Sequence, residues 1–261
     1  MNIVGSIKNA FLLSQKLLKV VLIFFILNVI MGLISLPLTT PENAAKPAAA
    51  VISFFFTVIF FVIFIFLQGG ALGLIRDIHK TGACSISNFS AYGKKYYLKI
   101  LGLLSIYILI ALGIALVLFL LGSGVLLIAN NAFVRALVTV MAVAVALVAV
   151  VMLLFPVYSI VVDESSILEA IKKGINISRN NFWEVLKIFL SLIAISVVVS
   201  LVIGFIIGII TIPLPLILTR VIITIVNSAV QSYIPIIMML VLMGYYLGLA
   251  KEGKSPHSPA V

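Results

Sequence analysis

Apolar residues in this chain fall into six long runs that are separated by short polar gaps. The runs cover residues 20–38, 48–75, 100–129, 136–162, 188–211 and 221–250, and the charged side chains lie outside them. Each run reaches or exceeds the roughly 20 residues that a helix needs to cross about 30 Å of hydrocarbon. The pattern therefore predicts an all-α integral membrane protein with six transmembrane helices. A β-barrel is not expected, because its strands would alternate apolar and polar positions.

The composition agrees with a membrane protein and excludes some other classes. Apolar residues make up 64% of the chain and charged residues 9%, whereas soluble domains have roughly 45–50% and about 25%. The net charge of +10 does not indicate nucleic-acid binding, because the basic residues are not clustered with stacking aromatics. A signal peptide is not expected either, because the first run is too long and a second follows almost at once. The single cysteine, Cys84, excludes an internal disulfide framework.

Basic residues are concentrated in every second gap between the runs. Fourteen Lys and Arg lie in one set of alternate segments and three in the other. The first set comprises residues 1–19, 76–99, 163–187 and the C-terminal tail, and the second contains Lys46, Arg135 and Arg220. The positive-inside rule predicts that the first set is cytoplasmic, so that both termini lie in the cytoplasm after six crossings. Residues 253–261 are predicted to form a short disordered tail.

Two of the basic segments carry apolar stripes at helical spacing. The first stripe runs from Ile3 to Phe11 and the second from Ile167 to Ile175, with a constant offset of 164 residues between them. A serine and a glutamate three residues later, in the sequence 166–169, fit a capping box at the start of the second helix. We expect both segments to be amphipathic helices at the inner membrane interface. Packing of these helices against other protein is the alternative.

The second and sixth runs end in similar sequences, which indicates an internal repeat. Gly69–Asp77 and Gly244–Glu252 share four identities and two charge-conserving matches in nine positions, and Phe155–Asp163 is a looser version. We infer one transmembrane domain, residues 1–252, built from three tandem units at about 1–75, 76–162 and 163–252. Each unit would consist of a cytoplasmic interfacial amphipathic segment, here called an elbow segment, followed by a helical hairpin. Their symmetry axis would run along the membrane normal, unlike that of inverted repeats.

Pairs of glycines four residues apart mark candidate helix-packing faces. Each pair leaves one face of a helix without side chains, so that a neighbouring backbone can approach closely. The six glycines are Gly69, Gly73, Gly204, Gly208, Gly244 and Gly248. The motif is compatible with oligomerisation or with packing inside one chain. Because two pairs recur at matching positions in the repeat, packing inside the chain is favoured.

Only a few polar or helix-breaking residues inside the runs are candidates for lining a cavity. These residues are Asn28, Gln68, Asn227, Gln231 and Pro235. Asn227 and Gln231 lie four apart on one face of the sixth run, and Pro235 removes a backbone donor, which predicts a kink. Further breaks are expected at Pro156 and at Pro213 and Pro215. Two interpretations remain: a small polar cavity, or interhelical hydrogen bonds that average about 0.6 kcal/mol each.

The cytoplasmic basic residues are candidates for contacts with anionic lipid headgroups. Such contacts contribute about 1 kcal/mol per Lys or Arg close to the membrane surface. The candidates are Lys94, Lys95, Lys99, Lys172, Lys173, Arg179 and Lys187.

Several motifs and residue types are absent from the sequence. No Asp, Glu, Lys, Arg or His lies deep in a run, and proton relays and ion-coupling sites usually depend on such residues. The sequence also lacks the zinc-protease, nucleophile-elbow and P-loop motifs. We therefore expect no enzymatic activity, no cofactor and no metal.

The chain resembles a group of uncharacterised prokaryotic six-helix membrane proteins. The resemblance lies in the segments Gly69–Gly73, Phe89 to Gly102, Phe155–Asp163, Ile167–Ser178 and Asn181–Trp183. Among the proteins resembled is the membrane domain attached to some glycerophosphodiester phosphodiesterases. This chain leaves no residues for their catalytic barrel, so the resemblance implies a membrane module without catalytic residues. It also implies the cytoplasmic membrane of a prokaryote.

Two functions are compatible with these observations. The first is a module at the inner leaflet that binds or transports a lipid or another amphiphile, with anionic membrane lipids as partners. The second is a structural, accessory or immunity-type protein that acts through helix contacts with a membrane protein partner. The lack of charge within the runs suits the second function, and the group formed by Asn227, Gln231 and Pro235 suits the first.

Overall fold

Long helices make up almost all of the described chain. The computed structural model describes residues 3–38, 40, 43, 46–129 and 131–252, and no strand occurs within these ranges. Six helical segments are long and apolar enough to cross a membrane: Ile3–Leu38, Pro47–Thr81, Ile86–Leu127, Ala132–Val162, Phe182–Thr211 and Leu216–Lys251. The predicted all-α class with six candidate membrane helices is thereby confirmed. The predicted tail at 253–261 and most of the turn after the first run lie outside the described residues.

The helices group into two compact units. Unit 1 contains Met1–Tyr97 and Ile188–Leu247, and unit 2 contains Leu98–Lys187 and Gly248–Val261. These boundaries fall inside long helices and do not coincide with the expected repeat boundaries near residues 75 and 162. The three-unit repeat within a single domain therefore stays a prediction.

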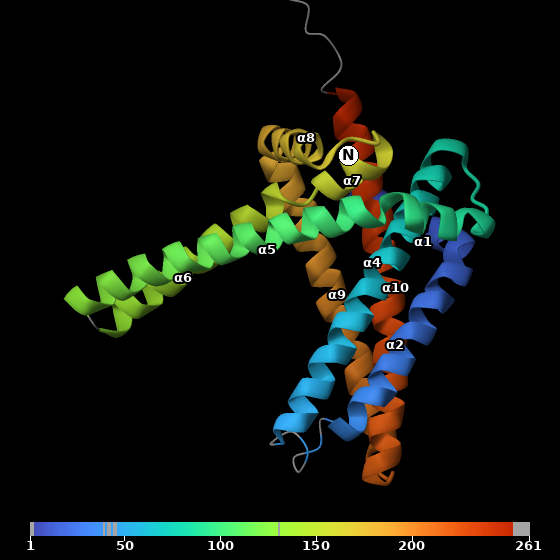
Figure 1. The fold of residues 1–261 in the computed structure, drawn as a ribbon, viewed down its shortest axis with the longest axis horizontal. Helices are drawn as coiled ribbons and strands as arrows, with labels where there is room; N and C mark the ends of the chain where they lie inside the picture. The colour runs from blue at the N-terminus through green and yellow to red at the C-terminus, as the bar shows by residue number, and fades with distance from the viewer. Residues whose placement is uncertain (1–2, 39, 41–42, 44–45, 130, 253–261) are drawn as a thin grey trace, which may run out of the picture. The chain divides into compact units, whose positions relative to one another are not determined.

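Unit 1 is assembled from helices that come from both ends of the chain (Figure 1). They are α1 (Ile3–Ser14), η1 (Gln15–Leu17), α2 (Leu18–Leu38), α4 (Pro47–Thr81), η2 (Ile86–Asn88), the start of α5 (Phe89–Ile128), and most of α9 (Phe182–Thr211) and α10 (Leu216–Glu252). As expected, α9 ends before Pro213 and α10 begins after Pro215. Helix α10 continues through Pro235, and the kink expected there stays a prediction.

The core of unit 1 lies toward the end of the helices that carries the basic segments. In α4 the buried positions are concentrated between Ile65 and Ile78, and in α10 between Ile236 and Tyr246. There the His79 ring nitrogen Nε2 lies 3.0 Å from the Leu240 carbonyl oxygen and joins α4 to α10. Toward the opposite end, side chains such as Phe54 and Phe55 are exposed. The helices of unit 1 therefore bury most of their side chains at one end and expose more of them toward the other.

Unit 2 contains an antiparallel helix pair and two shorter helices. These are the remainder of α5, α6 (Ala132–Met152), α7 (Pro156–Val162) and α8 (Ile167–Asn180). The break between α6 and α7 confirms the interruption expected at Pro156, which lacks the backbone donor that would continue the helix. The Tyr107 hydroxyl donates to the Leu153 carbonyl in this break, at 2.7 Å. That hydrogen bond ties α5 to the interrupted helix.

Helix α8 begins with the capping box expected from the sequence. The Ser166 hydroxyl accepts a hydrogen bond from the Glu169 backbone N–H at 3.4 Å, and Glu169 accepts one from the Ser166 backbone N–H at 3.1 Å. The Ser166 hydroxyl also donates to the Glu169 carboxylate at 2.8 Å, and this bond, together with the one from the Ser166 backbone N–H, lowers the pKa of Glu169. At the offset of 164, the buried Ala10 and Ser14 of α1 correspond to the buried Gly174 and Ser178 of α8. Both segments are helical, and their location at the membrane interface stays a prediction.

Candidate functional site

A tight chain reversal at the end of α4 builds the first candidate site. Gly82 adopts a left-handed conformation with φ of 74°, and its N–H donates to the Ile78 carbonyl at 2.9 Å. The Thr81 hydroxyl lies within hydrogen-bonding distance of the Asp77 and Ala83 carbonyls. Glycine is favoured here because a side chain would be strained at this φ. The reversal returns the chain through η2 into α5, whose first turns lie across α4.

Glycines allow α4 and α5 to cross closely. A Cβ on Gly73 would lie 2.6 Å from the Cβ of Tyr92, and one on Gly93 would lie 2.8 Å from the ring of Phe66. Both distances are too short for non-bonded carbon atoms. Gly73 therefore contacts a helix of the same chain, and Gly69 is buried beside it on α4.

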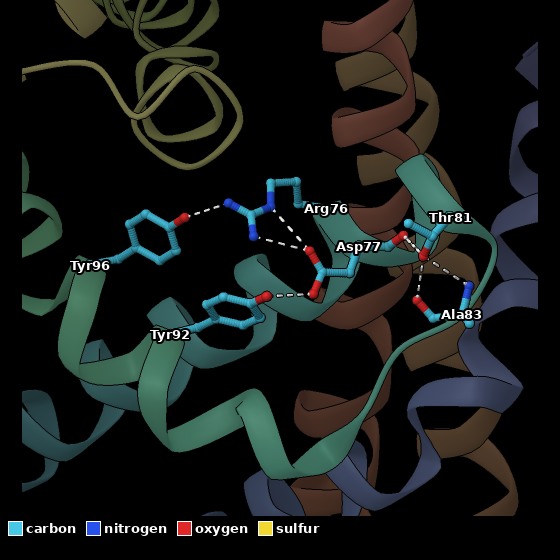
Figure 2. A network of polar contacts seen from close by, with 6 residues as sticks. All are labelled: Arg76, Asp77, Thr81, Ala83, Tyr92 and Tyr96. Carbon is cyan, nitrogen blue, oxygen red and sulfur yellow. Dashed lines mark hydrogen bonds and ion pairs between the residues drawn. The ribbon is translucent and has the colours of Figure 1, made fainter.

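A buried polar network joins the two helices where they cross, as Figure 2 shows. Arg76 Nη1 donates to the Tyr96 hydroxyl at 2.6 Å, and Arg76 Nη2 pairs with Asp77 Oδ1 at 3.0 Å. The Tyr92 hydroxyl donates to Asp77 Oδ2 at 2.6 Å. The guanidinium also lies 5.0 Å from the ring centroid of Tyr92 and 6.0 Å from that of Tyr96.

The network holds α5 on α4 without leaving an open cationic site. Arg76 is only 9% exposed, and its charge is balanced by Asp77 and by the faces of two tyrosines. The charge pattern of the sequence places Arg76 in the basic segment 76–99 and does not predict this network. The sequence does place Tyr92 and Tyr96 four residues apart, on one face of α5. That spacing could have indicated that both hydroxyl groups face polar residues of another helix.

A groove lies beside this crossing. Its volume is about 450 Å³, and it is lined by Val62, Ile63 and Phe66 of α4 and by Lys94 and Tyr97 of α5. The wall is therefore apolar, and its polar atoms come from one lysine and one tyrosine. Lys94 is exposed, so its ammonium group is available to a ligand.

Helix length predicts that this groove lies near a boundary of the hydrocarbon layer. Helix α4 has 35 residues, which corresponds to about 52 Å at 1.5 Å per residue, well beyond the thickness of about 30 Å. Phe66 lies about 28 Å along the helix from Pro47. If α4 enters the hydrocarbon near Pro47, Phe66 and the neighbouring Lys94 lie where it leaves the hydrocarbon.

Several other basic residues predicted to contact headgroups have partners within the chain. Lys95 lies 5.5 Å from the ring centroid of Tyr96. Lys99 donates to the carbonyls of residues 164 and 165, at 2.9 and 3.0 Å, and Lys173 pairs with Asp163 at 2.7 Å. Lys172, Arg179 and Lys187 are exposed, as Lys95 is. Lys94 is the predicted headgroup residue that lines the groove.

A second hollow lies between α2, α4 and α10. Its volume is about 370 Å³, and it brings together three of the residues predicted from the sequence to line a cavity: Asn28, Asn227 and Gln231. The other lining residues are Met31, Gly32, Ser35, Leu36, Thr57, Phe60, Thr224 and Ser228. Gln68 and Pro235 are half-buried elsewhere on α4 and α10 and do not line this hollow.

The predicted packing glycines occupy different environments. Gly204 and Gly208 line a smaller hollow of about 250 Å³ between α9 and α10, and a Cβ on either would meet no atom within 4 Å. Gly244 lies against His79, with 3.3 Å between a Cβ built there and the ring atom Cε1, and Gly248 is half-buried. The close contact expected at Gly204 and Gly208 is therefore not made within unit 1.

Comparison with known proteins identifies one family. The family model described as Domain of unknown function (DUF7847) matches residues 6–249. No curated protein and no solved structure matches the chain. In the described part of the chain, no group of three or more His, Cys, Asp or Glu is placed to hold a metal ion.

Proposed function

The chain belongs to the DUF7847 family, and we propose that it binds an anionic amphiphile, in the first place a membrane lipid, at the inner leaflet. The binding site in this proposal is the groove formed by α4 and the start of α5. The role is one of binding, or of binding as part of transport, without catalysis. We also propose that the chain is related to the membrane domains that accompany some glycerophosphodiester phosphodiesterases, and a role in binding lipid agrees with that relation.

The observation that carries this proposal is one lysine in the lining of an apolar groove. An acyl chain would lie along Val62, Ile63 and Phe66, and the headgroup would meet Lys94 and the Tyr97 hydroxyl. A volume of about 450 Å³ falls within the usual range of ligand pockets, roughly 300–1,000 Å³. The Arg76 network supports binding because it fixes α5 on α4 and so holds Lys94 at the groove before a ligand arrives.

Removing the charge of Lys94 is expected to weaken binding of an anionic lipid. Lys94→Gln should raise the Kd for short-chain phosphatidylglycerol about fivefold, which corresponds to the roughly 1 kcal/mol that a basic residue contributes near anionic lipid. The measurement is thermophoresis with the full chain in an uncharged detergent, titrated at low and at moderate salt.

Lys80→Gln is the matched control for this measurement. It removes the same charge from an exposed position near the end of α4, and Lys80 does not line the groove. We expect its Kd to stay within about twofold of the unmodified chain, because Lys80 makes no contact in the groove and its effect on a more distant anion is screened by salt. Equal weakening by both substitutions would mean that the groove has no specific role.

The proposal also places the basic ends of the helices in the cytoplasm. A fluorescent protein fused after residue 252 should therefore fluoresce, and alkaline phosphatase at the same position should be inactive. Fusions in the turn around residue 131, at the other end of α5 and α6, should give the reverse result. Phosphatase activity at the C-terminal fusion would overturn this orientation and with it the inner-leaflet location.

An accessory role through helix contacts is the second candidate. It is favoured by the open face of α9, where Gly204 and Gly208 meet no neighbouring atom and Phe205 is 71% exposed. A partner helix with a small-residue face could approach closely there. Gly208→Ile would abolish such an association, which a change of oligomeric mass in detergent would show. An unchanged mass would leave lipid binding as the remaining function.

A further inference from the structure

We infer that the hollow between α2, α4 and α10 is a second binding site, for an amphiphile whose polar group is uncharged and both donates and accepts hydrogen bonds. This inference goes beyond the proposed groove, because it concerns other residues, a different depth and a different ligand chemistry. It rests on the lining of the hollow, on two amide side chains that make no hydrogen bond to any described residue, and on where these lie along the helices.

The lining excludes a charged ligand group. Polar atoms reach the hollow from the amides of Asn28, Asn227 and Gln231 and from serine and threonine hydroxyls, and none of the lining residues is Asp, Glu, Lys, Arg or His. A charged headgroup there would lose its hydration without gaining a counter-ion, which is strongly unfavourable in a medium of low dielectric constant.

The hydroxyl groups of the lining are available mainly as acceptors. Thr57 donates to the Ser53 carbonyl at 2.8 Å. Thr224 and Ser228 donate to carbonyls one turn earlier in α10, also at 2.8 Å. Each hydroxyl hydrogen is therefore engaged by its own helix, and the oxygen lone pairs remain for a ligand. A ligand group must donate hydrogen bonds to use them.

The two amides of α10 provide the donors. Asn227 and Gln231 are exposed, and neither side chain makes a hydrogen bond within the described part of the chain. Asn28 differs, because its Nδ2 donates to Ser232 at 2.8 Å and leaves its carbonyl oxygen as an acceptor. A ligand that fits this set needs acceptors for the two NH₂ groups and donors for the oxygens, as a hydroxyl or a carboxamide group provides.

The position of the hollow along the helices explains why a ligand is needed there. Gln231 lies about 22 Å, and Thr224 about 12 Å, from the start of α10 at Leu216, and Thr57 lies about 15 Å from the start of α4. These distances fall within about 30 Å of hydrocarbon, where an unpaired amide is unfavourable and water is scarce.

The hollow is accessible from the side of the bundle. Thr57, Asn227 and Gln231 are exposed, so an amphiphile can enter laterally from the bilayer and lay its chain along Met31 and Phe60. The close approach of Gly32 to Thr224 holds α2 against α10 at one edge. A volume of about 370 Å³ accommodates a small headgroup and the first part of a chain.

The test uses a fluorescent reporter within the hollow. The full chain carrying Phe60→Trp and Trp183→Phe is placed in phosphatidylcholine nanodiscs and titrated with brominated monooleoylglycerol, an uncharged lipid with two hydroxyl groups. We expect saturable quenching of tryptophan fluorescence. Asn227→Leu together with Gln231→Leu should raise the Kd about tenfold, since two hydrogen-bonding amides are lost. Gln68→Leu, an amide replacement outside the hollow, should leave it unchanged.

Two further variants make the outcome decisive. Thr57→Phe fills the hollow without touching the amides and should abolish saturable quenching. Lys94→Gln should leave quenching unchanged, which separates this site from the groove. An unchanged Kd in the double leucine variant, or equally strong quenching by brominated phosphatidic acid, would overturn the inference. A second result would also overturn it. If the unmodified chain were dimeric, and the double leucine variant were monomeric but showed the same quenching, the two amides would serve a contact between copies of the chain.

Discussion

Replacing Gly73 with alanine is expected to lower the free energy of unfolding by about 1–3 kcal/mol, the usual cost of adding a methyl group to a filled contact. The added Cβ would lie 2.6 Å from the Cβ of Tyr92. That atom cannot rotate away, because it is attached directly to the α5 backbone. The two helices must therefore separate, and we expect the groove and its lipid binding to be lost together with stability. Unfolding in mild detergent, followed by circular dichroism, measures the change.

Gly204→Ala is the matched control, since it changes the same residue type in the same sequence motif. A Cβ there meets no atom within 4 Å, and alanine is favoured over glycine inside a helix by about 0.5–1 kcal/mol. We expect Gly204→Ala to be neutral or slightly stabilising. Equal destabilisation by the two substitutions would contradict the close crossing of α4 and α5.

Arg76→Met is expected to be more damaging, with a loss of about 3 kcal/mol, because removing one partner leaves a largely buried charge on the other. The Asp77 carboxylate would keep the hydrogen bond from the Tyr92 hydroxyl but lose the guanidinium. The Tyr96 hydroxyl would lose the hydrogen bond that it accepts from Arg76 at 2.6 Å. Unfolding in a chaotrope, with the midpoint compared at constant detergent concentration, measures this effect.

Two further variants separate the role of the network from that of a single charge. Arg76→Lys should restore little stability, because a lysine cannot donate to Tyr96 and Asp77 in the geometry of the planar guanidinium. Arg76→Met combined with Asp77→Leu should be less destabilising than Arg76→Met alone, because no unpaired carboxylate remains. Full recovery by Arg76→Lys would show that the charge alone matters, and the proposed geometric role of the network would fail.

The sequence predicts those features that depend on local pattern. Six helices follow from run length, the interruption before α7 follows from Pro156, and the start of α8 follows from Ser166 and Glu169. Of the five residues proposed from the sequence to line a cavity, Asn28, Asn227 and Gln231 line one hollow, whereas Gln68 and Pro235 do not. Their neighbours in the hollow, Thr57 and Thr224, were not identified, since single threonines in apolar helices carry no distinctive signal.

Features that depend on how helices cross could not be predicted in the same way. Gly73 and Gly204 belong to identical motifs, yet one contacts Tyr92 and the other faces a hollow. Spacing defines a face of a helix but not what covers it. The groove likewise depends on the left-handed turn at Gly82, which returns α5 across α4 and brings Lys94 beside Phe66. Lys173 and Lys99 show the same limit, because their partners, Asp163 and the carbonyls of residues 164 and 165, all lie between α7 and α8, where spacing along their own helices cannot indicate them.

The lipid that accompanies the purified chain tests the proposed binding of an anionic amphiphile most directly. Native mass spectrometry of the full chain, extracted in a mild detergent, should show one retained phospholipid with an anionic headgroup. The same preparation of Lys94→Gln should show most of that species lost, while Lys80→Gln keeps it. Retention of the same anionic lipid by Lys94→Gln, or retention only of uncharged lipids by the unmodified chain, would contradict binding at the groove.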